Sequence, residues 1–147
     1  MSKFSLSVII PILDEANNIE KLTKKLKKNL TSINFEIIFV DDNSLDSSKK
    51  ILERLKKKYK FFKPIFRNKR RDLTQSCFDG IKKSKYKNIL IMDGDLQHDP
   101  KYISNMIALY CKNALDIVIA SRPLIKGPNS GLSETRRLAS KILIYFK

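Results

Sequence analysis

The chain has 147 residues, of which 42% are hydrophobic and 31% charged, and its 30 Lys and Arg against 15 Asp and Glu give a formal net charge of +15. This composition excludes a low-complexity chain and suits one globular domain with a single core. The charge indicates an anionic partner, such as a membrane surface, a phosphorylated substrate or nucleic acid, or else a lysine-rich solvated surface.

The first half of the chain alternates between strand and helix patterns. Continuous apolar runs predict strands over Phe4 to Ile10 and over Glu36 to Val40. Apolar residues at helical spacing among lysines predict amphipathic helices over Asn17 to Leu30 and over Ser47 to Tyr59. Ser44 or Asp46 is expected to cap the second of these helices.

The second half continues the alternation. A weaker strand is predicted over Phe62 to Phe66, where Pro64 favours an edge position. The next helix, Leu73 to Lys83, carries Leu73, Cys77, Phe78 and Ile81. A buried strand of the parallel type is predicted over Asn88 to Met92.

One more helix and one more strand are expected after that. Asp99 and Pro100 match a helix N-cap followed by Pro at the first helical position. The helix they open would turn four apolar residues inward, namely Ile103, Met106, Ile107 and Tyr110. Asp116 to Ser121 is the last predicted strand.

This order of elements predicts an α/β fold with a mainly parallel sheet and helices on both faces. In such sheets, ligands bind in the crevice beyond the carboxyl ends of the strands. The polar groups that follow the predicted strands should therefore meet at one edge: Asp14 and Glu15, Asp41 and Asp42, Asp93 and Asp95, and Arg122.

Asp93, Asp95 and Gln97 alternate directly after the buried strand, with Gly94 allowing close approach of the backbone to a ligand. Oxygen donors of this kind suit Mg²⁺, which usually binds through one or two carboxylates plus substrate phosphates. The alternative is an ordinary strand-end turn, in which Asp and Gly are common. We expect the metal site.

Other polar residues are assigned by their position in the pattern. Asp42 is expected to contact a ligand, since adjacent carboxylates need cationic or hydrogen-bonding partners. His98 is expected to be a peripheral loop residue because no partner for proton transfer is visible. Arg122 is the best candidate for binding a further anionic group. Most of the other arginines, which include the cluster of Arg67, Arg70 and Arg71, are expected to be surface charges.

The two cysteines, Cys77 and Cys111, have no zinc-site or disulfide spacing, which predicts a reduced, intracellular setting. The segment before the first strand does not match a signal peptide, and no apolar run reaches the roughly 18 residues of a membrane span. Residues 134–147 form a basic amphipathic pattern, which fits either an anionic membrane interface or a core helix.

Three motifs in order carry a family resemblance. They are Val8 to Ile19 (VIIPILDEANNI), Phe39 to Ser44 (FVDDNS) and Asp93 to Pro100 (DGDLQHDP). With them the chain resembles family 2 glycosyltransferases of the GT-A (Rossmann-like) fold, and among these the dolichyl-phosphate mannosyltransferase type of polyprenyl-phosphate glycosyltransferase. The resemblance covers Ser5 to about Arg137.

The resemblance implies a role for each matching residue. Pro11, Leu13 and Glu15 would line the nucleotide pocket, with Leu13 where an aromatic residue is frequent. Val40 and Asp42 would lie near the base, and Asp93 and Gly94 near the nucleotide. Asp93, Asp95 and Gln97 would hold Mg²⁺ or Mn²⁺. Arg122 and Arg136 would face the phosphates, and Asp95 and Arg122 are the candidate catalytic residues.

The implied reaction is inverting transfer of a hexose from a nucleotide-diphosphate sugar, of the GDP-mannose or UDP-glucose type, to a polyprenyl phosphate lipid at the cytoplasmic face of a membrane. Such proteins usually continue past Arg137. We expect a nucleotide-sugar-binding domain over residues 1–133 and a short acceptor or membrane side over residues 134–147. A partner chain that completes it, a donor-binding domain without turnover and a nucleic-acid-binding module are the alternatives.

Overall fold

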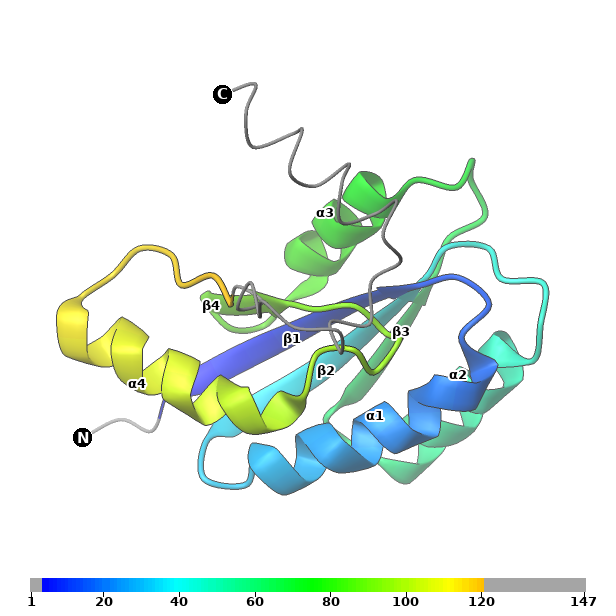
Figure 1. Cartoon of the computed structure of the whole chain (residues 1–147). Coiled ribbons are helices and arrows are strands. Elements are labelled where there is room, and N and C mark those ends of the chain that lie inside the picture. Colours follow the sequence, from blue (N-terminus) through cyan, green and yellow to red (C-terminus); the bar gives the residue numbers. More distant parts are fainter. Residues whose placement is uncertain (1–3, 121–147) are drawn as a thin grey trace, which may run out of the picture. The chain divides into compact units, whose positions relative to one another are not determined.

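The computed structural model describes residues 4–120 (Figure 1). The chain divides into two units after Asp116, and the helices and strands of the described region all belong to the first unit. These elements follow the order β1 (Ser5–Ile12), α1 (Ala16–Asn29), β2 (Asn34–Asp41), α2 (Ser48–Lys58), β3 (Phe62–Phe66), α3 (Leu73–Lys83), β4 (Asn88–Ile91), the 3-10 turn η1 (Pro100–Tyr102) and α4 (Ile103–Asn113).

The strands form one sheet in the order β3-β2-β1-β4, and all three pairings are parallel. Ile9 on β1 is paired with Ile38 on β2 and with Ile91 on β4. The strand that contains Pro64 lies at an edge, as predicted. All four carboxyl ends therefore face the same side of the sheet.

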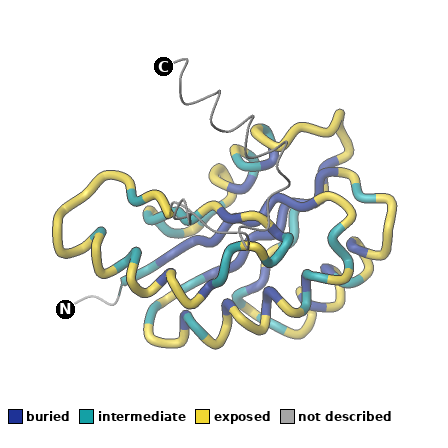
Figure 2. Tube along the Cα trace, viewed as in Figure 1, coloured by how far each residue is buried: buried dark blue, intermediate teal, exposed yellow. Residues whose placement is uncertain are grey.

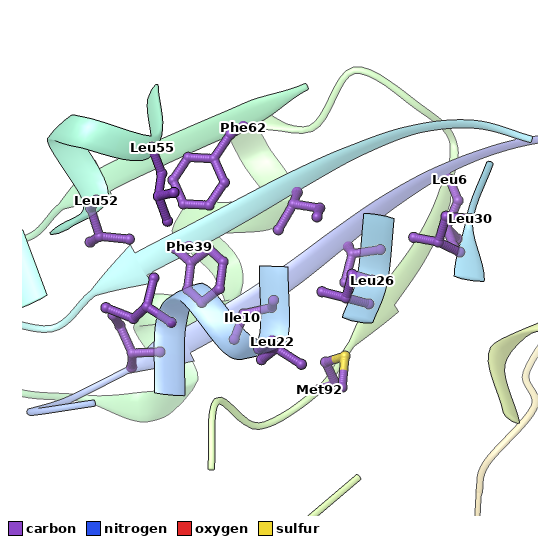
Figure 3. Close-up of a cluster of buried hydrophobic side chains, with 14 of the residues drawn as sticks. Leu6, Ile10, Leu22, Leu26, Leu30, Phe39, Leu52, Leu55, Phe62 and Met92 are labelled. Carbon is purple, nitrogen blue, oxygen red and sulfur yellow. The ribbon is translucent and has the colours of Figure 1, made fainter. Parts of the chain in front are cut away.

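Alternation along the two central strands separates two apolar layers. One face of β1 carries Leu6, Val8, Ile10 and Ile12, which join Leu22 and Leu26 of α1 and Leu52 of α2 in the main core (Figure 3). Ile103 of α4 packs into the same cluster. The outward surfaces of α1 and α2 are exposed and rich in lysine (Figure 2).

The opposite face of the sheet carries Ile9, Ile38 and Val40 and is covered by α3. Here the apolar residues of the predicted helix do not supply the buried face, because Leu73, Phe78 and Ile81 are exposed. The residues of α3 that are buried are Ser76 and Gly80. A Cβ on Gly80 would overlap Cγ2 of Ile9, so this helix approaches the sheet through its smallest residue.

The remaining differences from the expected helices and strands lie at the end of the described region. Asp99 caps Lys101 N at 3.1 Å as predicted, but the helix it opens begins with a 3-10 turn. The strand expected over 116–121 is not found in its described part, 116–120, where Ile117 and Ile119 are exposed. A β-branched run satisfies a local preference only, whereas a strand also needs a hydrogen-bonded neighbour.

Arg122, Arg136 and the predicted helix 134–147 lie outside the described residues, so the boundary after residue 133 stays a prediction. Within residues 4–120, no helix combines the length and the apolar character needed to cross a bilayer.

Candidate functional site

The carboxyl ends of β1, β2 and β4, and with them the predicted site residues that lie within residues 4–120, meet at one edge of the sheet (Figure 1). Pro11 is paired with Val40 across β1 and β2, and the next pair is Ile12 with Asp41. On the other side of β1, Met92 N donates to Ile9 O at 3.1 Å, directly before the acidic motif. The three motifs are thus neighbours because their strands are neighbours.

The loop after β1 is fastened to the loop after β2 through Asp14. Its carboxylate Oδ1 accepts from Leu45 N at 2.7 Å and from Asp46 N at 3.3 Å. In return, Asp14 N donates to Ser44 Oγ at 2.9 Å. Asp14 adopts a left-handed backbone, with φ of 57°, which Asp tolerates better than most residues. The two loops therefore form one connected wall.

Asp46 caps two helices at this wall. Its Oδ2 accepts from Ala16 N, the first residue of α1, at 3.0 Å, and its Oδ1 accepts from Ser48 N, the first residue of α2, at 2.8 Å. Burial acts to raise the pKa of Asp46, but the hydrogen bonds with Ser48 and Ala16 outweigh it and lower the pKa. The capping role expected for Ser44 or Asp46 thus belongs to Asp46.

Asp42 follows β2 on the α3 face and is buried. Its Oδ1 accepts a hydrogen bond from Arg67 Nη1, and its Oδ2 accepts from Asp72 N at 2.6 Å. Arg67 is itself buried, with 8% of its surface exposed, so the expectation that it is surface charge was wrong. A charge can be buried here because it is paired and hydrogen-bonded.

The acidic motif forms an open loop after β4. The Asp93 side chain is 58% exposed, and its Oδ2 lies 3.6 Å from His98 Nδ1. Asp95 Oδ1 accepts from Gln97 N at 2.9 Å. Between them, half-buried Leu96 has φ of 64°, an unusual backbone for a branched apolar residue, while its side chain packs on the core. His98, for which the sequence showed no partner, lies beside Asp93.

The donor set of this loop fits a hard divalent cation. Two carboxylates and one amide oxygen source lie within five residues, at Asp93, Asp95 and Gln97. In residues 4–120 no group of three or more His, Cys, Asp or Glu side chains is arranged to hold a metal ion. Mg²⁺ commonly binds through one or two carboxylates together with substrate phosphates, which suits this donor set.

Gly94 connects the acidic motif to the loop after β1. It is buried, and a Cβ added to it would lie 2.6 Å from Ile12 Cγ2 and 3.8 Å from Glu15 Cγ. Glu15 in turn accepts from Asn18 Nδ2 at 2.6 Å at the start of α1. The sequence suggested that Gly94 lets a ligand approach, and the structure gives its smallness a second reason, contact with Ile12.

The predicted pocket residues differ in what they expose. Leu13 is 40% exposed and Glu15 is half-buried, whereas Pro11 and Val40 are buried, Val40 fully. Leu13 and Glu15 are therefore accessible to a ligand, whereas Val40 offers no accessible surface and Pro11 little. Asp42, Asp93, Gly94 and Asp95 lie on the same sheet edge.

Arg67 is the residue at this edge that the sequence reasoning missed. The register of β2 and β3 explains why Arg67 lies here. Asp41 is paired with Phe66, so the residues that follow them, Asp42 and Arg67, are neighbours. The register itself becomes visible only once the sheet is assembled.

Comparison with known proteins agrees with this arrangement. The sequence profile of glycosyl transferase family 2 matches residues 7–146. A dolichol-phosphate mannosyltransferase of Pyrococcus furiosus is 36% identical over 136 residues, which are 92% of this chain and 38% of that protein. A dolichol-phosphate mannosyltransferase of Mycosarcoma maydis is 31% identical over 109 residues, 70% of this chain and 37% of that protein. The chain thus spans less than half the length of these relatives.

Solved structures share the fold at lower identity. The mannosyltransferase PcManGT of Pyrobaculum calidifontis, in complex with GDP-Man and Mn²⁺, aligns with a TM-score of 0.61 at 18% identity over 71% of this chain and 32% of that one. TarS of S. aureus in complex with UDP-GlcNAc gives 0.62 at 18% identity over 84% and 39%. The predicted α/β fold of the GT-A type, with a parallel sheet between helices, is confirmed. The chain belongs to glycosyl transferase family 2.

Proposed function

We propose that this chain forms the donor-binding part of an inverting glycosyltransferase, which moves a hexose from a nucleotide-diphosphate sugar to a polyprenyl or dolichyl phosphate. The observation that carries the proposal is the meeting of the three motif loops at one sheet edge, with Asp93 exposed and Asp95 half-buried beside the wall built by Asp14. The likeness to a dolichol-phosphate mannosyltransferase over 92% of the chain supports this substrate class.

In this proposal the nucleotide lies along the loops after β1 and β2. Leu13 and Glu15 contact it through side chains, while Pro11 and Val40, which are buried within the sheet, support these loops from beneath. Asp42 accepts a hydrogen bond from the base or ribose with the lone pairs that its protein partners leave available. The helices α1 and α2 begin at the same edge, and the dipoles at their N-termini favour an anionic ligand.

Asp93, Asp95 and Gln97 are the residues that would hold Mg²⁺ or Mn²⁺ together with oxygens of the diphosphate. When bound, the cation supplies positive charge that stabilises the departing diphosphate. Arg122 and Arg136, which lie outside the described residues, are proposed to face the donor or acceptor phosphates. Asp95 and Arg122 are the proposed catalytic residues.

The acceptor oxygen needs little activation. A phosphate monoester has a second pKa near ~6, so the lipid phosphate is largely a dianion at neutral pH. Its oxygen attacks C1 of the hexose, the bond from C1 to the diphosphate oxygen breaks, and the nucleoside diphosphate leaves with the electron pair. Attack from the opposite face inverts the configuration, and no general base is required.

A second candidate function is donor binding without turnover by this chain alone. The observation in its favour is that the chain spans 38% of the Pyrococcus furiosus relative. An assay of labelled-hexose transfer to dolichyl phosphate in detergent separates the two candidate functions. Donor binding without any transfer favours the second.

We also propose that the chain acts at the cytoplasmic face of a membrane with an anionic surface. The net charge of +15 and the exposed lysines of α1 and α2 support electrostatic attraction to acidic lipids. Sedimentation with phosphatidylserine vesicles, but not with phosphatidylcholine vesicles, is the expected result. Capture by nucleic acid in place of vesicles would contradict this part of the proposal.

The decisive experiment measures binding and not turnover. Calorimetric titration with GDP, UDP, GDP-mannose and UDP-glucose, each with Mn²⁺, with Mg²⁺ and with EDTA, should show binding of one nucleotide that depends on the metal. Asp95→Ala should abolish this binding, whereas Asp116→Ala, at an exposed carboxylate after α4, should preserve it. If no nucleotide binds under any metal condition, the proposed function is wrong.

A further inference from the structure

Arg67 occupies a position that surface charge does not explain. It follows β3, and its backbone N donates to Asp41 O at 2.9 Å, which extends the pairing of β3 with β2 by one step. This places its side chain on the α3 face of the sheet, next to Asp42, and only 4% of the Arg67 side chain is exposed. The burial of this guanidinium at the edge of the sheet that holds the proposed site therefore calls for an explanation.

The guanidinium of Arg67 is held from several sides. Nε donates to Asp79 Oδ2 at 3.1 Å, and Nη1 donates to Ser76 Oγ and to Asp72 O, each at 3.0 Å, as well as to Asp42 Oδ1. These partners lie on the first two turns of α3, on its N-cap and on the residue after β2. The planar fork of Arg suits such a multiple role, which the single ammonium of Lys cannot reproduce.

The same contacts fix Asp42. Its second oxygen accepts from Asp72 N at 2.6 Å, and Asp72 also caps α3 by accepting from Gln75 N at 2.9 Å. Asp79 is held in turn by Gln75 Nε2 at 3.0 Å. The hydrogen bond from Gln75 and the neighbouring Arg67 lower the pKa of Asp79, so it is an anion at neutral pH. Arg67, which follows β3, thus links β3 to Asp42 after β2 and to α3.

We infer that Arg67 is a positioning residue of the nucleotide site, which orients the Asp42 carboxylate toward the bound nucleotide. The inference rests on the proposed function, because it assigns Asp42 a nucleotide contact. A carboxylate has about four lone-pair sites, and the Arg67 and Asp72 bonds of Asp42 occupy two of them. The remaining lone-pair sites of Asp42 point in one fixed direction as long as the Arg67 guanidinium holds the carboxylate in place.

The main test replaces the planar guanidinium of Arg67 with an ammonium group and keeps the positive charge. Arg67→Lys should weaken nucleotide binding about tenfold in calorimetry, the size expected when a residue that orients a ligating group is lost. Arg54→Lys is the matched control, since Arg54 is an exposed arginine on α2, and it should bind nucleotide as the unaltered protein does. Thermal unfolding, measured in parallel, reports the stability change separately from the affinity of the folded protein.

A double-mutant cycle separates positioning from general damage. If Arg67 acts through Asp42, Arg67→Lys should cost little further affinity in an Asp42→Asn background. A purely structural role would lower the unfolding temperature and leave the dissociation constant of the folded protein unchanged. Additive losses of affinity in the cycle, or an unchanged dissociation constant in Arg67→Lys, would overturn the inference.

A milder variant covers the case in which Arg67→Lys does not fold. Asp79→Asn removes the anionic partner of Nε and leaves Arg67 and Asp42 in place, and the Asp79 side chain is 31% exposed. It should raise the dissociation constant about threefold, again only while Asp42 is present, and an unchanged constant counts against the inference.

The unaltered protein distinguishes failure of this inference from failure of the proposed function. Absence of nucleotide binding by the unaltered chain overturns both. Binding that is lost in Asp42→Asn but retained in Arg67→Lys and Asp79→Asn overturns only the role of Arg67.

Discussion

The backbone of Gly94 lies directly against the side chain of Ile12, so that an added Cβ would come within 2.6 Å of Ile12 Cγ2. This contact joins the acidic motif after β4 to the end of β1. Asp93 and Asp95 flank Gly94, so a shift of this loop that relieves the contact moves two of the three proposed metal ligands. The packing of one glycine thereby controls the geometry of the proposed site.

Gly94→Ala should weaken metal-dependent nucleotide binding about tenfold, because the loop must move away from Ile12 and catalytic geometry is sensitive to displacements of this size. Calorimetric titration with nucleotide and Mn²⁺ measures the effect. Retention of full affinity would show that the loop absorbs a methyl group without moving Asp93 or Asp95.

Gly80→Ala is a second glycine prediction, and it concerns stability. Its Cβ would overlap Ile9 Cγ2 and lie 3.2 Å from Val40 Cγ2, in the layer between α3 and the sheet. Overpacking of this kind costs about 1–3 kcal/mol of unfolding free energy, measured by urea denaturation. A stability equal to that of the unaltered protein would contradict the close packing of α3.

Asp46→Ala should destabilise the fold more than an ordinary cap mutation. Removal of one N-cap costs about 0.5–2 kcal/mol, and Asp46 accepts from the first residue of both α1 and α2. We therefore expect a loss near the upper end of that range, about 2 kcal/mol, in urea denaturation at pH 7. Glu53→Ala, at an exposed carboxylate within α2, is the control and should cost much less.

Glu36 should make stability depend on pH. Burial acts to raise its pKa, but hydrogen bonds with Lys63, with Ser7 and with the Lys85 N–H outweigh burial, and the pKa falls below the usual 4.5. A carboxyl whose pKa is lower in the folded state stabilises the protein above about pH 4.5, and this contribution is lost as the pH falls through the folded-state pKa.

Glu36→Gln tests this directly. We expect its urea midpoint to lie well below that of the unaltered protein at pH 7, and the difference to shrink below pH 4.5 as Glu36 becomes protonated. Glu53→Gln, at an exposed glutamate, serves as the control. A difference that stays constant from pH 7 to pH 3 would mean that the charge of Glu36 contributes nothing to stability.

Removal of metal should affect the nucleotide complex and not the free protein. Two carboxylates without a third acidic or histidine ligand among the described residues bind a divalent cation weakly, and the diphosphate is expected to supply the missing oxygens. EDTA should therefore leave the unfolding temperature of the free chain unchanged and cancel the stabilisation by nucleotide. A large effect of Mn²⁺ on the free chain would point to a complete metal site made by protein side chains.

The pattern of the sequence was enough to predict the alternating elements and the edge position of β3. Apolar periodicity reports which segments can bury a face, and it did so for β1, α1, β2 and α2. It failed for α3, where Ser76 and Gly80 face the sheet and Leu73 and Phe78 do not. Close helix packing and a buried ion pair select small and polar residues, which a hydrophobic pattern does not register.

The sequence by itself determined the family, through its three motifs. It also determined that these motifs meet, because strand-end residues of a parallel sheet lie at one edge whatever the details of packing. Only the tertiary structure decided what these residues contact. The pairing of Arg67 with Asp42, the cap of α1 by Asp46 and the contact of Gly94 with Ile12 all join segments at least 25 residues apart. Contacts between distant segments depend on register and helix placement, and local sequence carries no record of either.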